Sequence, residues 1–255
     1  MSGLDGRHAL VTGAGRGIGA AIARSLVEAG ARVSLVGRAH VPLEALRAEL
    51  GAACAVQTAD VTRDSDIGAA IAGAQAQFGP IDILVNNAGA AASGPFERLE
   101  RTTWDSMLAV NLTAVYSCCQ AVLPSMLARD WGRIVTIAST AGLKGYPYVA
   151  AYVAAKHGAI GLTRALALET ARSGVTINAV CPGYTDTDLI EEAAARIEAA
   201  SGRSRDSVRA SFAKANPQGR LVKPEEVANT VLWLCRPGSE AITGQSIVVA
   251  GGEVT

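Results

Sequence analysis

The chain has 255 residues, of which 49% are hydrophobic types, 18% are charged and 27 are glycine. This composition excludes a disordered chain, which would be rich in charge and poor in apolar residues, and the strict glycine period of collagen is absent. The 23 basic and 23 acidic residues cancel, which argues against nucleic-acid or anionic-membrane partners, because these select a basic surface. Aromatic residues are only 4% of the chain, yet four of the five tyrosines lie between positions 146 and 184.

The cysteines and the amino terminus indicate the compartment. The five cysteines are odd in number, form no C-x-x-C pair and lie mostly in apolar runs. They are typical of buried thiols in a reducing compartment rather than of a disulfide framework or a zinc site. The start, MSGLDGRHALV, has no basic segment followed by an apolar one, and no uncharged apolar run reaches 18 residues. We therefore expect a cytoplasmic protein with no signal peptide and no membrane span.

Short apolar runs rich in β-branched residues alternate along the chain with longer runs of helical period. This alternation predicts repeated strand–helix–strand units and an α/β fold of the Rossmann type, with a doubly wound parallel sheet and helices on both faces. The predicted strands are 8–12, 32–36, 53–57, 81–86, 133–138, 176–180 and 246–250. The predicted helices are 17–29, 41–50, 64–78, 102–129, 149–172 and 224–235.

No linker, repeat or low-complexity stretch divides the chain, so we expect a single domain over residues 1–255. The segment 186–215 departs from the alternation. It is helical in composition, has no strand of its own and interrupts the pattern just before the last unit. We therefore expect it to be an insertion within this domain.

A glycine-rich turn follows the first predicted strand. HALVT runs directly into G-A-G-R-G-I-G at 13–19, and a run of helical period comes next. In such a setting Gly13 allows the tight turn, Gly17 lets the backbone approach a pyrophosphate, and Gly19 lets the helix pack on the strand. The helix N-terminus then presents free N–H groups and its positive dipole end to the anion. The spacing G-x-x-x-G-x-G, rather than G-x-G-x-x-G, indicates a variant family of dinucleotide-binding loops.

The end of the second predicted strand bears on the choice of cofactor. NAD-binding folds place a carboxylate there for the ribose 2′-hydroxyl, whereas this strand ends Val36-Gly37-Arg38 with no acid before Glu44. The guanidinium of Arg38 suits a 2′-phosphate, which it can bind bidentately, and Arg16 in the glycine loop is a second candidate for the same group. The pattern favours NADP(H) over NAD(H). The alternative is that Arg38 is an ordinary surface arginine.

Tyr152 and Lys156 stand four residues apart in a helical run, so their side chains share one face. An adjacent ammonium favours the phenolate and lowers the pKa of a tyrosine toward the range useful for acid–base catalysis. By itself this spacing also occurs often by chance, between a surface tyrosine and a surface lysine that have no catalytic role. Ser139 follows the predicted strand 133–138, at the edge of the sheet where ligands bind. Its hydroxyl would bind a substrate carbonyl beside the tyrosine; the alternative is a helix cap or a turn.

In these motifs the chain resembles the branch of the short-chain dehydrogenase/reductase family that has about 250 residues. The motifs stand in family order, cover nearly the whole chain and are T-G-A-G-R-G-I-G (12–19), Asp60-Val61, N-N-A-G (86–89), Asn111, Ser139, Y-V-A-A-K (152–156) and P-G-Y-T-D-T (182–187). Two positions depart from the family pattern. Ala250 precedes Gly251-Gly252 where many members carry aspartate, and Ser139-Thr140 replaces the more usual Ser-Ser.

The resemblance implies an NAD(P)-dependent oxidoreductase that interconverts a ketone and a secondary alcohol by hydride transfer. It assigns Tyr152 as the general acid–base group that protonates the carbonyl oxygen during reduction. Lys156 would lower the pKa of Tyr152 and bind the nicotinamide ribose. Ser139 would orient and polarise the substrate oxygen, and Asn111 would hold a water-linked proton relay behind Lys156.

The resemblance also implies a cofactor site in which Asp60 contacts the adenine, Asn87 to Gly89 line the cofactor and Pro182 to Thr187 bind the carboxamide. No metal is expected. The full set of expected cofactor-binding residues is Gly13, Arg16, Gly17, Ile18, Gly19, Arg38, Asp60, Val61, Asn87, Ala88, Gly89, Tyr152, Lys156, Pro182, Gly183, Thr185 and Thr187.

The clustered tyrosines are candidates for the substrate side of the site. Tyr146 and Tyr148 lie with Thr140 between Ser139 and Tyr152, and Tyr184 follows the proline–glycine turn. We expect Thr140 and these three tyrosines to line the substrate pocket; for the tyrosines the alternative is packing or a subunit interface.

The segment 186–215 would be the lid over that pocket. The basic excess of its second half would attract an anionic group such as coenzyme A or a carrier-protein phosphopantetheine, unless it is only a solvated helix face. The overall pattern is similar to reductases of 3-oxoacyl thioesters, or 3-hydroxyacyl-CoA dehydrogenases in the reverse direction. The resemblance further implies a homotetramer built on the helices near 102–129 and 149–172.

Two other functions compete with this interpretation. A catalytically silent nucleotide-binding redox regulator would keep the fold, but such a protein would often have lost a catalytic residue, and all four are present here. Sugar-nucleotide epimerases share the Y-x-x-x-K pair, but they usually need a longer chain with a distinct substrate region.

Overall fold

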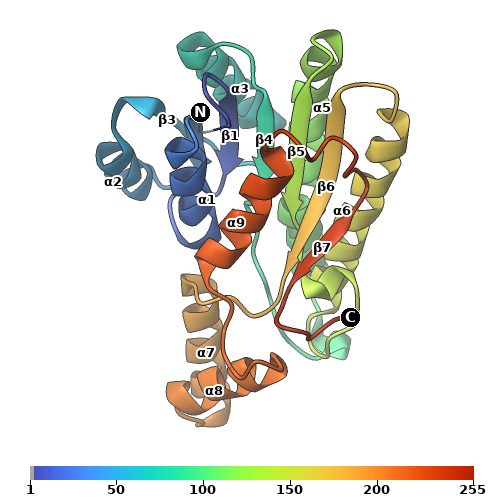
Figure 1. Ribbon diagram of the computed structural model, residues 1–255. Helices are drawn as coiled ribbons and strands as arrows, with labels where there is room; N and C mark the ends of the chain where they lie inside the picture. Colours follow the sequence, from blue (N-terminus) through green and yellow to red (C-terminus); the bar gives the residue numbers. More distant parts are fainter. Residues whose placement is uncertain (1–2) are drawn as a thin grey trace.

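The computed structural model describes residues 3–255, apart from the side chain of Ala200. Its centre is a parallel sheet of seven strands in the order β3-β2-β1-β4-β5-β6-β7 (Figure 1). The strands are β1 (His8–Thr12), β2 (Arg32–Gly37), β3 (Cys54–Thr58), β4 (Ile83–Asn86), β5 (Gly132–Ile137), β6 (Val175–Pro182) and β7 (Ser246–Val249). The predicted doubly wound α/β fold is confirmed, and each strand lies within two residues of its predicted bounds. The chain reverses its direction across the sheet between β1 and β4, which is the switch point where such folds bind ligands.

The helices cover both faces of the sheet (Figure 1). They are α1 (Gly17–Glu28), α2 (His40–Leu50), α3 (Asp64–Phe78), α4 (Arg101–Leu108), α5 (Ala114–Ala128), α6 (Ala150–Glu169), α7 (Asp188–Ser201), α8 (Arg205–Ala215) and α9 (Pro224–Cys235). Short 3₁₀ turns occupy Gly51–Ala53, Phe96–Arg98 and Thr140–Gly142, and a π-helical turn spans Ala109–Thr113.

Two predicted elements are divided in the structure. The helix predicted over 102–129 is interrupted by the π-helical turn that joins α4 to α5. The inserted segment forms two helices, because α7 ends at Gly202 in the left-handed region, with φ at 71°. These two helices stand together beyond one end of the sheet (Figure 1).

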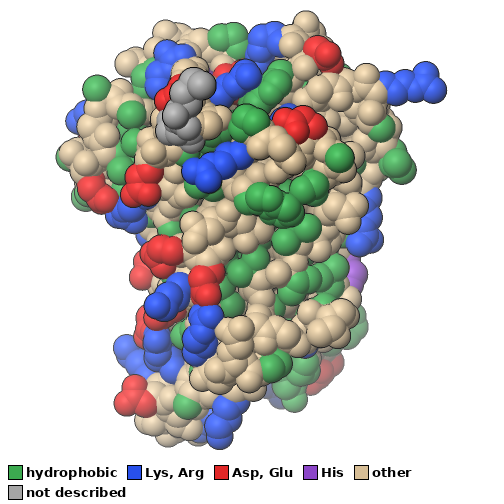
Figure 2. Space-filling view, in the orientation of Figure 1, with side chains coloured by type: hydrophobic (Ala, Val, Ile, Leu, Met, Phe, Trp, Pro, Cys, Tyr) green, Lys and Arg blue, Asp and Glu red, His purple; other side chains and the backbone are tan. Residues whose placement is uncertain are grey.

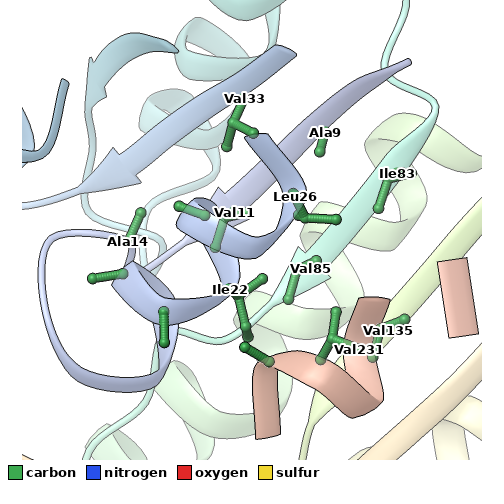
Figure 3. Packing of buried hydrophobic residues seen from close by; sticks show 14 of the residues in the cluster. Ala9, Val11, Ala14, Ile22, Leu26, Val33, Ile83, Val85, Val135 and Val231 are labelled. Atoms are coloured by element: carbon green, nitrogen blue, oxygen red, sulfur yellow. The ribbon is translucent and has the colours of Figure 1, made fainter. Parts of the chain in front are cut away.

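Alternate residues of the strands fill the two faces of the sheet. On one face α1 and α9 pack together, and Ile22, Leu26 and Val231 meet Val11 and Val85 of the strands (Figure 3). On the other face α3 and α5 bury a second apolar cluster. Full burial of a side chain of this size is worth about 1.5–3 kcal/mol. The five cysteines are unpaired and buried, as their apolar surroundings predict.

The helical stretch Arg101–Ala128 is long and apolar enough to cross a membrane by length and composition alone, with a mean hydropathy of 1.4 in its best window. A core helix passes the same test. Val115, Val122 and Met126 on this stretch are buried in the core against the sheet. The same helix leaves Tyr116 and Leu127 exposed on its outer side.

Candidate active site

The glycine turn lies between β1 and α1, at the switch point of the sheet. Gly13 and Gly17 adopt left-handed φ angles of 64° and 54°, which side chains other than glycine rarely adopt. A Cβ atom at Gly19 would collide with the carbonyl oxygen of Gly13. The N-cap of α1, Arg16, makes no capping hydrogen bond through its side chain. The first N–H groups of α1 are therefore available to an anion, and the turn forms the cradle that a pyrophosphate requires.

The N-N-A-G segment packs on this turn. The Asn87 amide nitrogen donates to the carbonyls of Thr12 and Gly13, at 2.9 and 3.1 Å. The backbone N–H groups of Asn87 and Ala88 both donate to the Thr12 hydroxyl at 3.0 Å. The side chain of Asn87, expected to line the cofactor, is thus engaged in fixing the glycine turn.

Gly89 links this turn to the predicted catalytic residues. A Cβ atom at Gly89 would lie 2.8 Å from Asn111 Oδ1 and 3.7 Å from Lys156 Nζ. Asn111 is 1% exposed and donates through Nδ2 to the carbonyls of Ala90, at 2.9 Å, and Met107, at 3.1 Å. It lies in the π-helical turn, a feature that is frequent at functional sites.

Tyr152 and Lys156 lie on α6, next to Ser139 at the end of β5. Lys156 is 5% exposed, and its Nζ lies 5.6 Å from the centre of the Tyr152 ring. The Tyr152 and Ser139 hydroxyls form a hydrogen bond. Ser139 also caps the turn Thr140–Gly142 by accepting a hydrogen bond from Ala141 N at 3.1 Å. The interpretation of Ser139 as a cap is therefore right, and it coexists with contact to the tyrosine.

The pKa values at this site are governed by burial. Burial raises the pKa of Tyr152, and the hydrogen bond with Ser139 opposes this shift. Burial lowers the pKa of Lys156 to about 8. Lys156 is expected from the sequence to lower the pKa of Tyr152, but its Nζ donates to the Ile137 carbonyl at 2.8 Å, and burial dominates in this structure. Tyr152 therefore keeps its proton at neutral pH, which is the state needed to protonate a carbonyl oxygen.

At the adenosine end of the expected cofactor site, Arg38 and Asp60 follow the neighbouring strands β2 and β3. Hydrogen bonds from Thr62 lower the pKa of the Asp60 carboxyl, and the charge of Arg38 adds to this shift. Arg38 is exposed, and within residues 3–255 its guanidinium makes no hydrogen bond or close ion pair. Val61 is buried beneath this surface.

Arg16 does not lie free beside Arg38. Its guanidinium is 2.9 Å from Glu192 and 3.3 Å from Asp188, both on α7. The structure thus shows Arg16 joining the glycine turn to the predicted lid. A 2′-phosphate would have to compete with two carboxylates for it.

The P-G-Y-T-D-T segment leads from β6 to the predicted lid. Pro182 ends β6, and the Gly183 N–H donates to the Val249 carbonyl at 3.0 Å. The Thr185 hydroxyl donates to the Gly183 carbonyl at 3.0 Å. A Cβ atom at Gly17 would lie 3.2 Å from Thr187 Cγ2. This segment and the glycine turn therefore border the same space, while Ile18 faces inward and packs on the core.

The loop between Ser139 and Tyr152 carries the expected substrate residues. The hydroxyls of Tyr146 and Thr140 are 2.8 Å apart, and the Tyr146 ring meets the Tyr184 ring edge to face. Tyr148 is 66% exposed and has a left-handed φ of 67°, an unfavourable angle for a bulky side chain. Its carbonyl accepts a hydrogen bond from Gly94 N at 2.8 Å.

Two residues on this side were not predicted from the sequence. Phe212 of α8 stacks on Tyr184, with ring centres 4.8 Å apart. Glu253 accepts a hydrogen bond from the Tyr146 hydroxyl. No local motif marks either of them, although Phe212 is the only aromatic residue in the segment 186–215.

The basic residues of α8 are largely paired within the insertion. Arg209 bonds to Asp186, at 3.0 Å, and contacts Glu191. Arg205 lies 2.6 Å from Glu198. Positive and negative side chains are intermixed over this part of the surface (Figure 2). This pairing favours a solvated, charge-balanced face over a site for an anionic group.

Residues 7–198 match the family model described as short chain dehydrogenase. The chain belongs to the short-chain dehydrogenase family. Family membership confirms the expected oxidoreductase and the Rossmann fold.

Several members of the short-chain dehydrogenase family align over almost the full chain. A putative ketoacyl reductase of Streptomyces coelicolor is 41% identical, over 99% of this chain and 98% of its own. A D-beta-hydroxybutyrate dehydrogenase of Cupriavidus necator is 36% identical, over 98% and 99%. A crystal structure of a tryptophan-substituted variant of the actinorhodin polyketide ketoreductase with NADPH is 40% identical and covers 97% of both chains, with a TM-score of 0.93.

Proposed function

We propose that this short-chain dehydrogenase is an NADPH-dependent reductase of 3-oxoacyl thioesters or closely related ketones. The observation that carries the proposal is the convergence of Ser139, Tyr152 and Lys156 at the end of β5. The names of the similar ketoacyl reductases support the substrate class. A D-beta-hydroxybutyrate dehydrogenase at similar identity makes a free 3-oxo acid the second candidate.

The residues present fit a dinucleotide. A Cβ at Gly19 would collide with the carbonyl oxygen of Gly13 and disrupt the glycine turn, and the lack of a side chain at Gly89 lets the backbone lie close to Asn111 Oδ1. When bound, the nicotinamide cofactor supplies the hydride that reduces the carbonyl carbon.

The proposed proton chemistry belongs to the chain itself. Tyr152 gives its hydroxyl proton to the carbonyl oxygen, while the Ser139 hydroxyl donates a hydrogen bond to the same oxygen and orients it. The ammonium of Lys156 stabilises the phenolate that remains on Tyr152. Asn111 is a positioning residue, because its amide holds the backbone of Ala90 beside Lys156. We propose that Asn111 also holds a water-linked proton relay behind Lys156.

The proposed preference for NADP(H) rests on Arg38. Its guanidinium is exposed and has no close polar partner among the described residues, whereas Arg16 is paired with α7. A 2′-phosphate accepts two parallel hydrogen bonds from a guanidinium, and the 2′-hydroxyl of NADH does not. The NADPH complex of the similar actinorhodin ketoreductase supports this choice.

The lid and the assembly are further parts of the proposal. Helices α7 and α8 act as a lid within one domain over 1–255, tied to the glycine turn by Arg16. The exposed apolar residues Tyr116, Leu127 and Leu168 on α5 and α6 suit burial in a homotetramer. Buried free thiols are consistent with a reducing, cytoplasmic setting.

The direct test is the loss of absorbance of NADPH or NADH with a panel of ketones. The panel contains a 3-oxoacyl thioester, the matching free 3-oxo acid and a simple ketone. We expect the highest kcat/KM with NADPH and the thioester. A higher kcat/KM for the free 3-oxo acid than for the thioester would make the free acid the substrate class. Equal rates with NADH and NADPH would contradict the proposed role of Arg38.

A further inference from the structure

The chain after β7 brings a carboxylate into the substrate side of the site. Gly251 and Gly252 have φ angles of 59° and 93°, and a Cβ at Gly251 would overlap the side chain of Asn216. This turn, which only glycine fits, places the side chain of Glu253 in the interior, where it is 3% exposed. The residue lies outside every motif that marks the cofactor and catalytic sites.

The contacts of Glu253 are unequal for its two oxygens. Oε1 accepts a hydrogen bond from the Tyr146 hydroxyl and lies 3.3 Å from Lys144 Nζ. Oε2 is buried and has no hydrogen-bond partner among the described residues, and a Cβ at Gly183 would lie 2.8 Å from it. A buried carboxylate with one unpaired oxygen is costly. A general role in stability is therefore a poor explanation for it.

Tyr146 connects this carboxylate to the turn that Ser139 caps. A carboxylate has no proton to give, so Tyr146 donates to Glu253 and accepts from the Thr140 hydroxyl, 2.8 Å away. Thr140 is 4% exposed and begins the 3₁₀ turn whose N-cap is Ser139. The polar contacts thus run from Glu253 through Tyr146 to the residue that follows Ser139.

The ring of Tyr146 also connects Glu253 to the proposed lid, through contacts between aromatic rings. It meets Tyr184 edge to face at 6.3 Å, and Tyr184 stacks on Phe212 of α8. Lys144 Nζ lies 4.9 Å from the centre of the Tyr146 ring and 3.3 Å from the Glu253 carbonyl oxygen. Lys144 thereby balances the charge of the carboxylate and holds Glu253 against the loop between Ser139 and Tyr152.

We propose that Glu253 is a positioning residue for the ketone, acting through Tyr146 to hold the Thr140 turn and Ser139 in place. The inference rests on the proposed roles of Ser139 and Tyr152. Within the described residues, the polar side-chain contacts of Glu253 and Tyr146 lead to Thr140 and Lys144 and not to the glycine turn. The group that Glu253 helps to position is therefore the oxygen of the substrate and not the cofactor. Displacement of a reacting group by about 1 Å can cost about a hundredfold in rate.

The test is a double-mutant cycle on the full chain. Glu253→Ala and Tyr146→Phe remove the same hydrogen bond from its two ends, and Tyr146→Phe leaves the ring in contact with Tyr184. We expect each to lower kcat/KM for the ketone by about tenfold or more, and the double variant to be no worse than the poorer single variant. The dissociation constant for NADPH, measured by fluorescence, stays within about twofold of wild type.

Two matched variants separate positioning from general damage. Glu253→Gln keeps an acceptor for the Tyr146 hydroxyl at the same place, and we expect it to retain most of the kcat/KM. Glu49→Gln alters a carboxylate on the exposed surface of α2, paired with Arg24, and leaves kcat/KM unchanged. The thermal midpoint of each variant shows whether it folds, and Tyr146→Phe with Glu253→Gln decides the question if Glu253→Ala does not.

Additive losses in the cycle, wild-type kcat/KM in Tyr146→Phe, or a parallel loss of NADPH affinity would overturn the inference. So would a Glu253→Gln variant as impaired as Glu253→Ala. Tyr152→Phe keeps this result separate from the proposed function. If Tyr152→Phe is inactive while Glu253→Ala and Tyr146→Phe are fully active, only the role of Glu253 fails; if Tyr152→Phe turns over normally, the proposed mechanism fails.

Discussion

Lys156 Nζ donates a hydrogen bond to the backbone carbonyl of Ile137, 2.8 Å away, at the end of β5. This contact fixes the buried ammonium beside the Tyr152 ring, 5.6 Å from its centre. The two residues therefore share an environment in which burial acts in opposite directions. It raises the pKa of the phenol and lowers the pKa of the ammonium.

The first prediction is the dependence of ketone reduction on pH. The pKa of Lys156 is lowered to about 8, so Lys156 loses its charge as the pH rises through that value, while Tyr152 with its raised pKa stays protonated. We expect kcat/KM for reduction to be level near neutral pH and to fall above about pH 8, because the developing phenolate loses its neighbouring charge. Initial rates between about pH 6 and pH 10 check this. A level profile across that range would be inconsistent with a catalytic role for the ammonium.

The second prediction concerns Arg38. We expect Arg38→Ala to weaken NADPH binding by about tenfold to a hundredfold, the worth of a charge-assisted hydrogen-bond pair, and to leave NADH binding almost unchanged. Fluorescence titration of both cofactors gives the two dissociation constants. Arg101→Ala is the control, because Arg101 is an exposed arginine paired with Asp105 on α4. Equal weakening of NADPH binding and NADH binding by Arg38→Ala would show that the guanidinium does not bind the 2′-phosphate.

The third prediction concerns stability and rests on His8, which is fully buried at the start of β1. Its ring nitrogens bond to the Gly79 carbonyl, at 2.8 Å, and to the Ser34 hydroxyl, at 2.9 Å. Burial lowers the pKa of His8 below its ordinary value. The unfolded chain then binds the proton more readily, so stability is lost as the pH falls below about 6.5 toward the folded-state pKa.

Urea unfolding at about pH 7.5 and pH 5.5 measures that loss. In His8→Gln the group that titrates is absent, so the difference in unfolding free energy between the two pH values becomes smaller. His157→Gln is the control, because His157 is exposed on α6. The same pH dependence in His8→Gln and wild type would mean that other groups account for the acid sensitivity.

The strands and the central motifs could be predicted from the sequence because each rests on a local pattern. A strand buried on both faces is a short apolar run with turn residues at its ends, and the predicted bounds of β1 are the observed ones. The glycine turn is equally local, since Gly13, Gly17 and Gly19 are required by backbone geometry.

Features that depend on contacts between distant segments could not be predicted. The break in the helix near Asn111 has no proline or glycine to mark it. The pairing of Arg16 with Glu192 spans 176 positions, and that of Tyr146 with Glu253 spans 107. The effect of burial on the pKa of Tyr152 could not be predicted for the same reason, because the sequence shows the spacing to Lys156 but not the burial of either group.

The most direct test of the central claim is the turnover of Tyr152→Phe. This substitution removes one hydroxyl and leaves the ring, so the variant should fold and bind NADPH as wild type does. Ser139 and Lys156 remain, but no group in the site can then give its proton to the carbonyl oxygen in the same position. The account predicts wild-type affinity for NADPH together with loss of nearly all NADPH oxidation in the presence of ketone. Turnover close to that of wild type would contradict it.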